Sequence, residues 1–170
     1  MTNEGLKSEI ITILSDLVDQ GQRIVVVHGG GPFIKKALAD ARIESEFIDG
    51  HRKTSPEALH HVEKALKGEV NTDIVRQFNK VGKKAVGLSG KDGRIVTAVK
   101  RVHIGSDDGK EMDLGQVGDV GNIDPALINL LLEKNYIPVM TCIAADEEGE
   151  DYNINADMFA GHMAGALNAD

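Results

Sequence analysis

Apolar residues follow two different patterns along this chain. In some stretches they recur every three or four positions, which is typical of helices that bury one face. In others they form short continuous runs, which favour buried strands. The first pattern predicts helices over 6–18, 33–41, 54–67, 70–82, 125–132 and 156–167. The second predicts strands over 23–27, 84–88, 94–102 and 137–143, and a shorter extended segment over 46–54.

The long predicted helical stretch over 54–82 has a start signal and an interruption. Thr54 is expected to cap its first turn, and Glu57, three residues on, to close a capping box with it. Pro56 is compatible with a first helical turn because its missing N–H would have no partner there. Gly68 is expected to break or bend the helix, which divides the stretch into two segments.

Strands and helices alternate in the predicted order, and one hairpin interrupts them. Asp49-Gly50 and Asp107-Asp108-Gly109 are turn sequences, and the second leads into an extended segment over 111–120. This alternation predicts an α/β fold, a three-layer αβα sandwich with a mostly parallel sheet and an inserted β-hairpin. A further strand should follow the last helix, so we expect the 170 residues to be incomplete as a domain.

A run of glycines, His28-Gly29-Gly30-Gly31-Pro32, joins the first predicted strand to the second predicted helix. Its backbone N–H groups lie beside the positive end of a helix, at the edge of the sheet where α/β proteins bind ligands, so it favours an anion site. The spacing matches neither a dinucleotide fingerprint nor a P-loop, because Ile34 stands where each requires glycine. Many α/β proteins make such a turn on glycine without binding anything.

The composition excludes several classes of partner. The formal net charge is −8 and no basic block occurs, which argues against nucleic acid and anionic membranes. No apolar run approaches the ~20 residues of a membrane span. The single cysteine, Cys142, lies in an apolar run, and we interpret it as a core thiol of a cytoplasmic protein rather than a nucleophile.

The stretch Asn153-Ile154-Asn155-Ala156-Asp157 is the second unusual segment. In an extended backbone Asn153 and Asn155 lie on one side, where their amides can bind a carboxylate or an amide. Asn155 alone is also explained as the cap of the last helix, with Asp157 as a favourable acid in its first turn. The three polar residues together favour a ligand site over a simple cap.

Other candidate residues have ordinary alternatives. Arg52 can bind a carboxylate through two hydrogen bonds, and Lys91, in a glycine-rich turn, can neutralise a phosphate. Considered alone, a residue such as Arg52 is more often an ordinary surface charge, and surface charge is also the alternative for Lys91. His28 ends a strand, where a hydrogen-bonded structural histidine is expected. No spacing of His, Cys and Asp resembles a metal cage, so no metal ligands are predicted.

Several segments together resemble one family, the N-acetyl-L-glutamate kinases of the amino acid kinase superfamily. The resemblance extends along essentially the whole chain. It rests on segments at 25–32 (VVVHGGGP), 49–54 (DGHRKT), 67–71 (KGEVN), 85–93 (AVGLSGKDG), 115–118 (GQVG), 136–139 (YIPV), 144–149 (AADEEG) and 152–157 (YNINAD). The glycine turn alone would fit other amino acid kinases, and its combination with Asp-Gly-x-Arg and Asn-x-Asn-Ala-Asp is what resembles the acetylglutamate enzymes.

The resemblance implies an activity, the ATP- and Mg²⁺-dependent phosphorylation of the side-chain carboxylate of N-acetyl-L-glutamate in arginine biosynthesis. Gly30 and Gly31 would offer N–H groups to the substrate and the transferred phosphoryl group. Arg52 would hold the α-carboxylate of the substrate. Asn153 would hydrogen-bond the bound acetylglutamate, and we place Asn155 with it.

The resemblance also implies how the nucleotide side of the site is arranged. Asp157 would orient the catalytic lysines rather than act as a base. We assign Gly29 and Lys91 to the cofactor side. Mg²⁺ would be bound through the nucleotide, with most of its site outside this chain.

Two features of the family have no counterpart in residues 1–170. These are a first strand ending in Lys-x-Gly-Gly and a C-terminal nucleotide-binding half with a second catalytic lysine. We therefore expect the chain to correspond to the N-terminal substrate-binding lobe and to be close to inactive alone. The alternative is a non-catalytic amino-acid-binding or dimerisation module. The resemblance further implies a homodimer formed through this lobe, with the helix after Thr54 as the candidate contact.

Overall fold

The computed structural model describes residues 4–48, 51–104 and 110–169. Its centre is a parallel sheet of three strands in the order β1-β9-β4, which are β1 (Val26–His28), β9 (Ile137–Thr141) and β4 (Ala85–Ser89). The middle strand, β9, is buried along its whole length, as expected of a strand covered on both faces. The expected α/β sandwich with its parallel sheet is confirmed.

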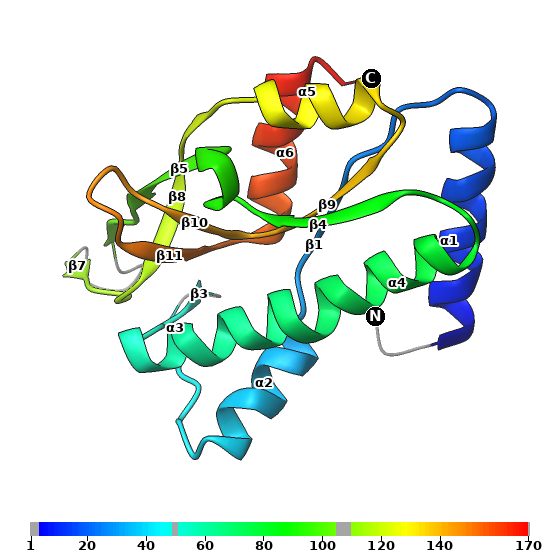
Figure 1. Cartoon of the computed structure of the whole chain (residues 1–170). Helices are drawn as coiled ribbons and strands as arrows, with labels where there is room; N and C mark the ends of the chain where they lie inside the picture. The colour runs from blue at the N-terminus through cyan, green and yellow to red at the C-terminus, as the bar shows by residue number, and fades with distance from the viewer. Residues whose placement is uncertain (1–3, 49–50, 105–109, 170) are drawn as a thin grey trace.

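A second group of strands closes into a small barrel beside this sheet (Figure 1). It consists of β5 (Val96–Lys100), β8 (Val117–Ile123), β10 (Ile143–Ala145) and β11 (Asp151–Ile154). Two short antiparallel ribbons, β2 (Phe47–Ile48) with β3 (His51–Arg52) and β6 (His103–Ile104) with β7 (Glu111–Met112), flank the two expected turns. The tips at 49–50 and 105–109 lie outside the described residues.

Helices cover both faces of the sheet (Figure 1). On one face lie α5 (Ala126–Glu133) and α6 (Ala156–Leu167). On the other lie α1 (Glu4–Asp19), α2 (Gly31–Asp40), α3 (Pro56–Glu63) and α4 (Thr72–Lys80). Neighbouring residues of β9 face opposite sides. Accordingly, Val139 packs in a cluster with Phe78 of α4, whereas Met140 packs in another with Phe159 of α6.

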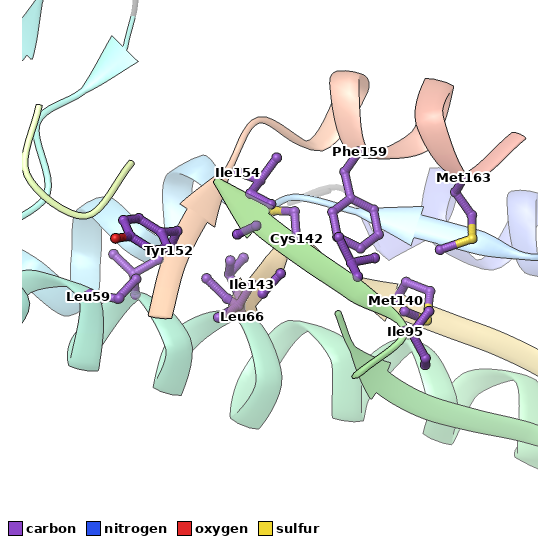
Figure 2. Close-up of a cluster of buried hydrophobic side chains, with 14 of the residues drawn as sticks. Leu59, Leu66, Ile95, Met140, Cys142, Ile143, Tyr152, Ile154, Phe159 and Met163 are labelled. Atoms are coloured by element: carbon purple, nitrogen blue, oxygen red, sulfur yellow. The ribbon is translucent and has the colours of Figure 1, made fainter. Parts of the chain in front are cut away.

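The apolar run 137–143, expected to be one strand, is two. β9 ends at Thr141, and β10 begins at Ile143 and pairs with β11 of the barrel instead of the central sheet. Cys142 stands between them, buried among the side chains shown in Figure 2. This burial confirms a core thiol, and it raises the pKa of the thiol to about 11.

The helical stretch after Thr54 differs from expectation in its cap, and its interruption takes one of the two expected forms. Ser55 caps α3 by accepting a hydrogen bond from the Ala58 N–H at 3.1 Å, so the expected Thr54 cap is wrong. Thr54 is buried, and its hydroxyl donates to the Arg52 carbonyl at 3.0 Å instead. Gly68 does not break the helix, but the regular α-helix is interrupted around it, because the chain passes from α3 into α4 through a π-helical segment, η1 (Lys64–Asn71).

Candidate functional site

The carboxyl ends of the three central strands lie in one row. His28 of β1 and Ser89 of β4 both stand in register with Thr141 of β9. Ligands of open α/β sheets gather at this edge. The glycine turn follows His28 directly, so the structure places it at the edge where a ligand is expected.

The glycine turn forms the start of α2. Gly30 occupies the N-cap position, no side chain caps the helix, and Pro32 in the first turn contributes no N–H group. A helix start with uncapped N–H groups and a positive dipole end favours a bound anion. The expected geometry of the turn is therefore present.

A cavity of about 580 Å³ opens beside this turn. Its walls come from the glycine turn, α1, the end of η1 and α4. The cationic side chains of its wall are paired: Lys7 Nζ lies 2.6 Å from an Asp73 carboxylate oxygen and 2.7 Å from Glu4, and Arg76 also binds Asp73. The hydrogen bond to Asp73 is the main reason that the pKa of Lys7 is raised.

The last predicted segment meets the glycine turn directly. A Cβ atom placed on Gly29 would lie 3.3 Å from the Cβ of Ala156, at the start of α6. Asn155 caps α6, since its side-chain oxygen accepts hydrogen bonds from the N–H groups of Asp157 at 3.0 Å and Met158 at 3.1 Å. The capping role is confirmed, and a substrate contact through the remaining NH₂ group of Asn155 stays a prediction.

Backbone hydrogen bonds connect the Arg52 segment to Asn153. The Gln116 N–H donates to the Thr54 carbonyl at 2.7 Å, and the Asn153 N–H donates to the Gln116 carbonyl at 3.0 Å. Thr54 in turn holds the Arg52 carbonyl. Close approach here requires glycine at position 115, because a Cβ would lie 2.3 Å from the Thr54 carbonyl oxygen. Segments from three distant parts of the sequence are thus joined.

The Arg52 side chain is half-buried and held in place. Its guanidinium hydrogen-bonds Ser45 and lies 4.5 Å from the centre of the Phe47 ring. Burial lowers the pKa of Arg52, which still leaves the group charged at neutral pH. Neither contact is with a carboxylate, so the positive charge of Arg52 is not neutralised within the described residues.

Lys91 is engaged by two acids. Its Nζ lies 2.7 Å from Glu63 at the end of α3 and 2.6 Å from Asp151 at the start of β11. Burial opposes the effect of these acids, but their hydrogen bonds dominate and raise the pKa of Lys91. In this structure Lys91 joins two elements, and its assignment to the cofactor side stays a prediction.

Sequence reasoning expected His28 to be a hydrogen-bonded structural residue but gave no role to Asn71 and Lys67, which form a polar cluster with it between η1 and the sheet. Asn71 is buried there, and its amide nitrogen lies 2.8 Å from the Val139 carbonyl oxygen and 3.0 Å from His28 Nε2. Lys67 donates to the Gly87 carbonyl at 3.0 Å and to Asp92 at 2.9 Å. The only sequence signal was the segment 67–71, which carried part of the resemblance without an assigned role.

The part of the chain that the structure describes has neither a cluster of metal ligands nor a membrane-spanning helix. No group of three or more His, Cys, Asp or Glu side chains there is placed to hold a metal ion. No helix among those residues is both long and apolar enough to cross a membrane.

The protein-family model and two curated proteins that match this chain all belong to the amino acid kinases. The model of the amino acid kinase family matches residues 1–170. An acetylglutamate kinase from Methanococcus aeolicus is 46% identical over 99% of the chain, and one from Moorella thermoacetica is 44% identical over 100%. The chain spans 58% of the length of both relatives.

Solved structures give the same fold. The protein smu.665 from Streptococcus mutans superimposes with a TM-score of 0.82 at 30% identity, over 94% of this chain and 62% of that one. An N-acetylglutamate synthase from Neisseria gonorrhoeae, solved with coenzyme A and N-acetyl-glutamate, gives 0.78 at 20% identity, over 98% of this chain and 37% of that one. At that identity the second match establishes the fold alone.

Proposed function

The chain belongs to the amino acid kinase family, and from this we propose that residues 1–170 form the acceptor-binding lobe of an acetylglutamate kinase. The reaction is the transfer of the γ-phosphoryl group of ATP to the side-chain carboxylate of N-acetyl-L-glutamate. We place it in arginine biosynthesis and in the cytoplasm, whose reducing conditions suit the free thiol of Cys142.

One observation supports this proposal: contacts connect the segments that carry the glycine turn, the start of α6 and Arg52. The contact between Gly29 and Ala156 joins the first two, and the hydrogen bonds from Thr54 through Gln116 to Asn153 join the third. An acylated amino acid with two carboxylates needs a cation for one of them, amide partners for its acyl group and N–H donors at the other. Arg52, Asn153 and the glycine turn offer these three kinds of group.

The chemistry requires positioning more than proton transfer. A carboxylate oxygen attacks the γ-phosphorus, the bond from that phosphorus to the leaving ADP oxygen breaks, and an acyl phosphate forms. The attacking carboxylate is already ionised at neutral pH, so no strong base is needed. The barrier lies in bringing two anions together and in stabilising the charge of the transferred group.

In this proposal the residues of the chain divide that work. The N–H groups of Gly30 and Gly31 stabilise the anionic oxygens at the start of α2. Arg52 holds the α-carboxylate, and Asn153, with Asn155, holds the rest of the acceptor. Asp157 lies exposed in the first turn of α6, where it orients cationic groups rather than removing a proton.

The uncapped start of α2 also fits a phosphoryl group, so we assign Gly29 to the ATP side. We assign Lys91 to the same side because it lies in a glycine-rich turn, where its ammonium group can neutralise a phosphate. Mg²⁺, bound through the phosphates of ATP, supplies further neutralisation of their charge. We also propose that two copies of the chain pair through this lobe, with α3 at the contact; sedimentation measurements test this directly.

Calorimetric titration of residues 1–170 with N-acetyl-L-glutamate tests the acceptor site, with L-glutamate and ATP as controls. We expect saturable binding of acetylglutamate and weaker binding of glutamate, and Arg52→Gln should weaken binding roughly tenfold or more. The matched variant Lys53→Gln, which removes a neighbouring surface cation paired with Glu46, should leave the affinity unchanged. A folded protein that does not bind acetylglutamate, or binds it equally well without Arg52, would overturn the proposal.

A further inference from the structure

The amide of Asn71 has a fully determined orientation. Its Nδ2 lies 2.8 Å from the Val139 carbonyl oxygen, an atom that only accepts hydrogen bonds, so the nitrogen and not the oxygen must face β9. The same nitrogen lies 3.0 Å from His28 Nε2. An NH₂ group has two protons, and these two acceptors use both.

This orientation fixes the protonation of His28. Since Nε2 accepts a hydrogen bond from the Asn71 amide, it carries no proton of its own, and the neutral ring holds its proton on Nδ1. His28 Nδ1 lies 3.0 Å from the carbonyl oxygen of Gly29, which it can therefore reach only as a donor. Burial lowers the pKa of His28, assisted by the nearby charge of Lys67, in agreement with a neutral ring.

The space around Asn71 admits one arrangement. A Cβ atom on Gly87 of β4 would lie 2.0 Å from Asn71 Oδ1. The Asn71 amide therefore occupies the space that the side chain of any residue other than glycine would need at position 87. Asn71 is 2% exposed, at the end of η1. The side chain is therefore fixed between β9, β4 and His28.

We propose that Asn71 is a positioning residue for the glycine turn, acting through His28, an inference that rests on the function proposed above. Asn71 holds His28 in its Nδ1-protonated form, and His28 holds the carbonyl oxygen of Gly29, which belongs to the Gly29–Gly30 peptide group of the turn. Glycine has unusual backbone freedom, so three in succession are free to rotate their peptide planes unless one is held. Fixing the Gly29 carbonyl keeps the following N–H groups directed toward a bound anion before it arrives.

Nitrogen NMR of the histidine rings tests the proposal in the unmodified protein. We expect His28 to show a protonated Nδ1 and an unprotonated Nε2 near neutral pH. This measurement requires no ligand, so it is independent of the acceptor's identity. A His28 ring protonated on Nε2 would overturn the proposal whatever the protein binds.

Two variants disturb the same contact by different means. Asn71→Asp replaces the donor with a group that only accepts, which should move the proton of His28 to Nε2 or charge the ring. Gly87→Ala leaves Asn71 chemically unchanged but displaces it. Each should weaken acetylglutamate binding by roughly tenfold or more in folded protein, with the altered His28 spectrum.

Matched controls separate positioning from general damage. Asn79→Asp makes the same chemical change at an exposed side chain whose oxygen accepts from the Ala85 N–H, and Gly68→Ala adds a methyl group on η1 where nothing lies within 4 Å. Both should retain the wild-type His28 spectrum and affinity. If a folded Asn71 or Gly87 variant binds acetylglutamate with wild-type affinity, the positioning role is refuted. If wild type shows the expected His28 form but does not bind acetylglutamate, the proposed acceptor fails and the positioning role fails with it.

Discussion

Gly30 lies against Leu66 so closely that a Cβ atom built on the glycine would come 2.8 Å from Leu66 Cδ2. It would also lie 3.1 Å from a Val70 methyl group. Both neighbours belong to η1, and Leu66 is fully buried. The glycine turn is therefore packed against the helix beneath it, and its shape depends on the absence of a side chain at this position.

Gly30→Ala should accordingly push the turn away from η1. Overpacking of this kind costs about 1–3 kcal/mol of unfolding free energy. Urea denaturation should show this loss, and titration with acetylglutamate should show weaker binding. Gly31→Ala is the control for stability, because nothing lies within 4 Å of a Cβ there. Equal stability of the two variants would contradict the packing argument.

Lys91 gives a prediction about stability. Replacing it with Met leaves the carboxylates of Glu63 and Asp151 facing each other without a cation. We expect a loss of about 1 kcal/mol at neutral pH, typical of a partly exposed ion-pair group. The raised pKa of Lys91 means that its contribution is complete below the unfolded-state pKa and disappears as pH rises through the folded-state value.

The difference between wild type and Lys91→Met should therefore shrink in strongly alkaline urea titrations. Lys36→Met, which removes an exposed partner of Asp40, should have little effect at any pH. If Lys91→Met is as stable as wild type, the ion pairs of Lys91 with Glu63 and Asp151 do not stabilise the fold. The assignment of Lys91 to the cofactor side would then be its remaining role.

The contacts of Asp92 predict how the stability of the protein changes as the pH falls. It accepts hydrogen bonds from Lys67 at 2.9 Å and from the Ser89 N–H at 2.7 Å. Burial acts in the opposite direction, but these partners dominate and lower the pKa of Asp92. Its contribution is present above the unfolded-state pKa of about 3.9 and is lost as pH falls through the lower folded-state value.

Asp92→Asn should thus be less stable than wild type at neutral pH, and the two should converge in acid. Urea denaturation at a series of pH values between neutrality and acid measures this convergence. Asp16→Asn, on the exposed face of α1, is the control and should follow wild type throughout. If the difference in unfolding free energy between Asp92→Asn and wild type is the same at every pH, the ionisation of Asp92 does not contribute to stability as predicted.

Thr141 carries a buried hydroxyl without a hydrogen-bond partner among the described residues. Thr141→Val replaces that hydroxyl with a methyl group, so we expect unchanged stability or a gain of up to about 1 kcal/mol. Thr54 is equally buried, but its hydroxyl binds the Arg52 carbonyl, so Thr54→Val should lose about 1–2 kcal/mol. Thermal melts of Thr141→Val and Thr54→Val measure the two changes in stability. Equal changes would contradict the difference in hydrogen bonding between the two hydroxyl groups.

Much of the fold follows from local sequence patterns. Helical periodicity over 6–18 predicted α1, which spans Glu4–Asp19, and the glycine turn was placed between a strand and a helix. Local patterns failed where distant contacts decide the outcome. Continuous apolarity over 137–143 does not reveal that the chain changes sheets at Cys142. Thr54 and Ser55 are both good caps, and contacts of Thr54 with Leu114 and Gln116 leave the cap to Ser55.

The candidate site likewise contains some residues that local sequence could identify and others that it could not. Glycines, Arg52 and the Asn-Ala-Asp segment could be singled out because their chemistry is evident in a few adjacent residues. Asn71 could not, because its importance depends on His28, Val139 and Gly87, which come from three strands. Lys91 was noticed for its charge, but its two acidic partners are distant in sequence and no pattern predicts them.

The π-helical winding of η1 fixes how α3 and α4 face the sheet. A π-helical turn contains more residues than an α-helical turn, so η1 holds extra residues between the two α-helices. If the same eight residues were wound as a regular α-helix, at about 100° per residue, α4 would be rotated relative to α3. Leu66 and Phe78 could then not both keep their places in the two core clusters. The winding of η1, and not its side chains alone, therefore determines which residues reach the glycine turn.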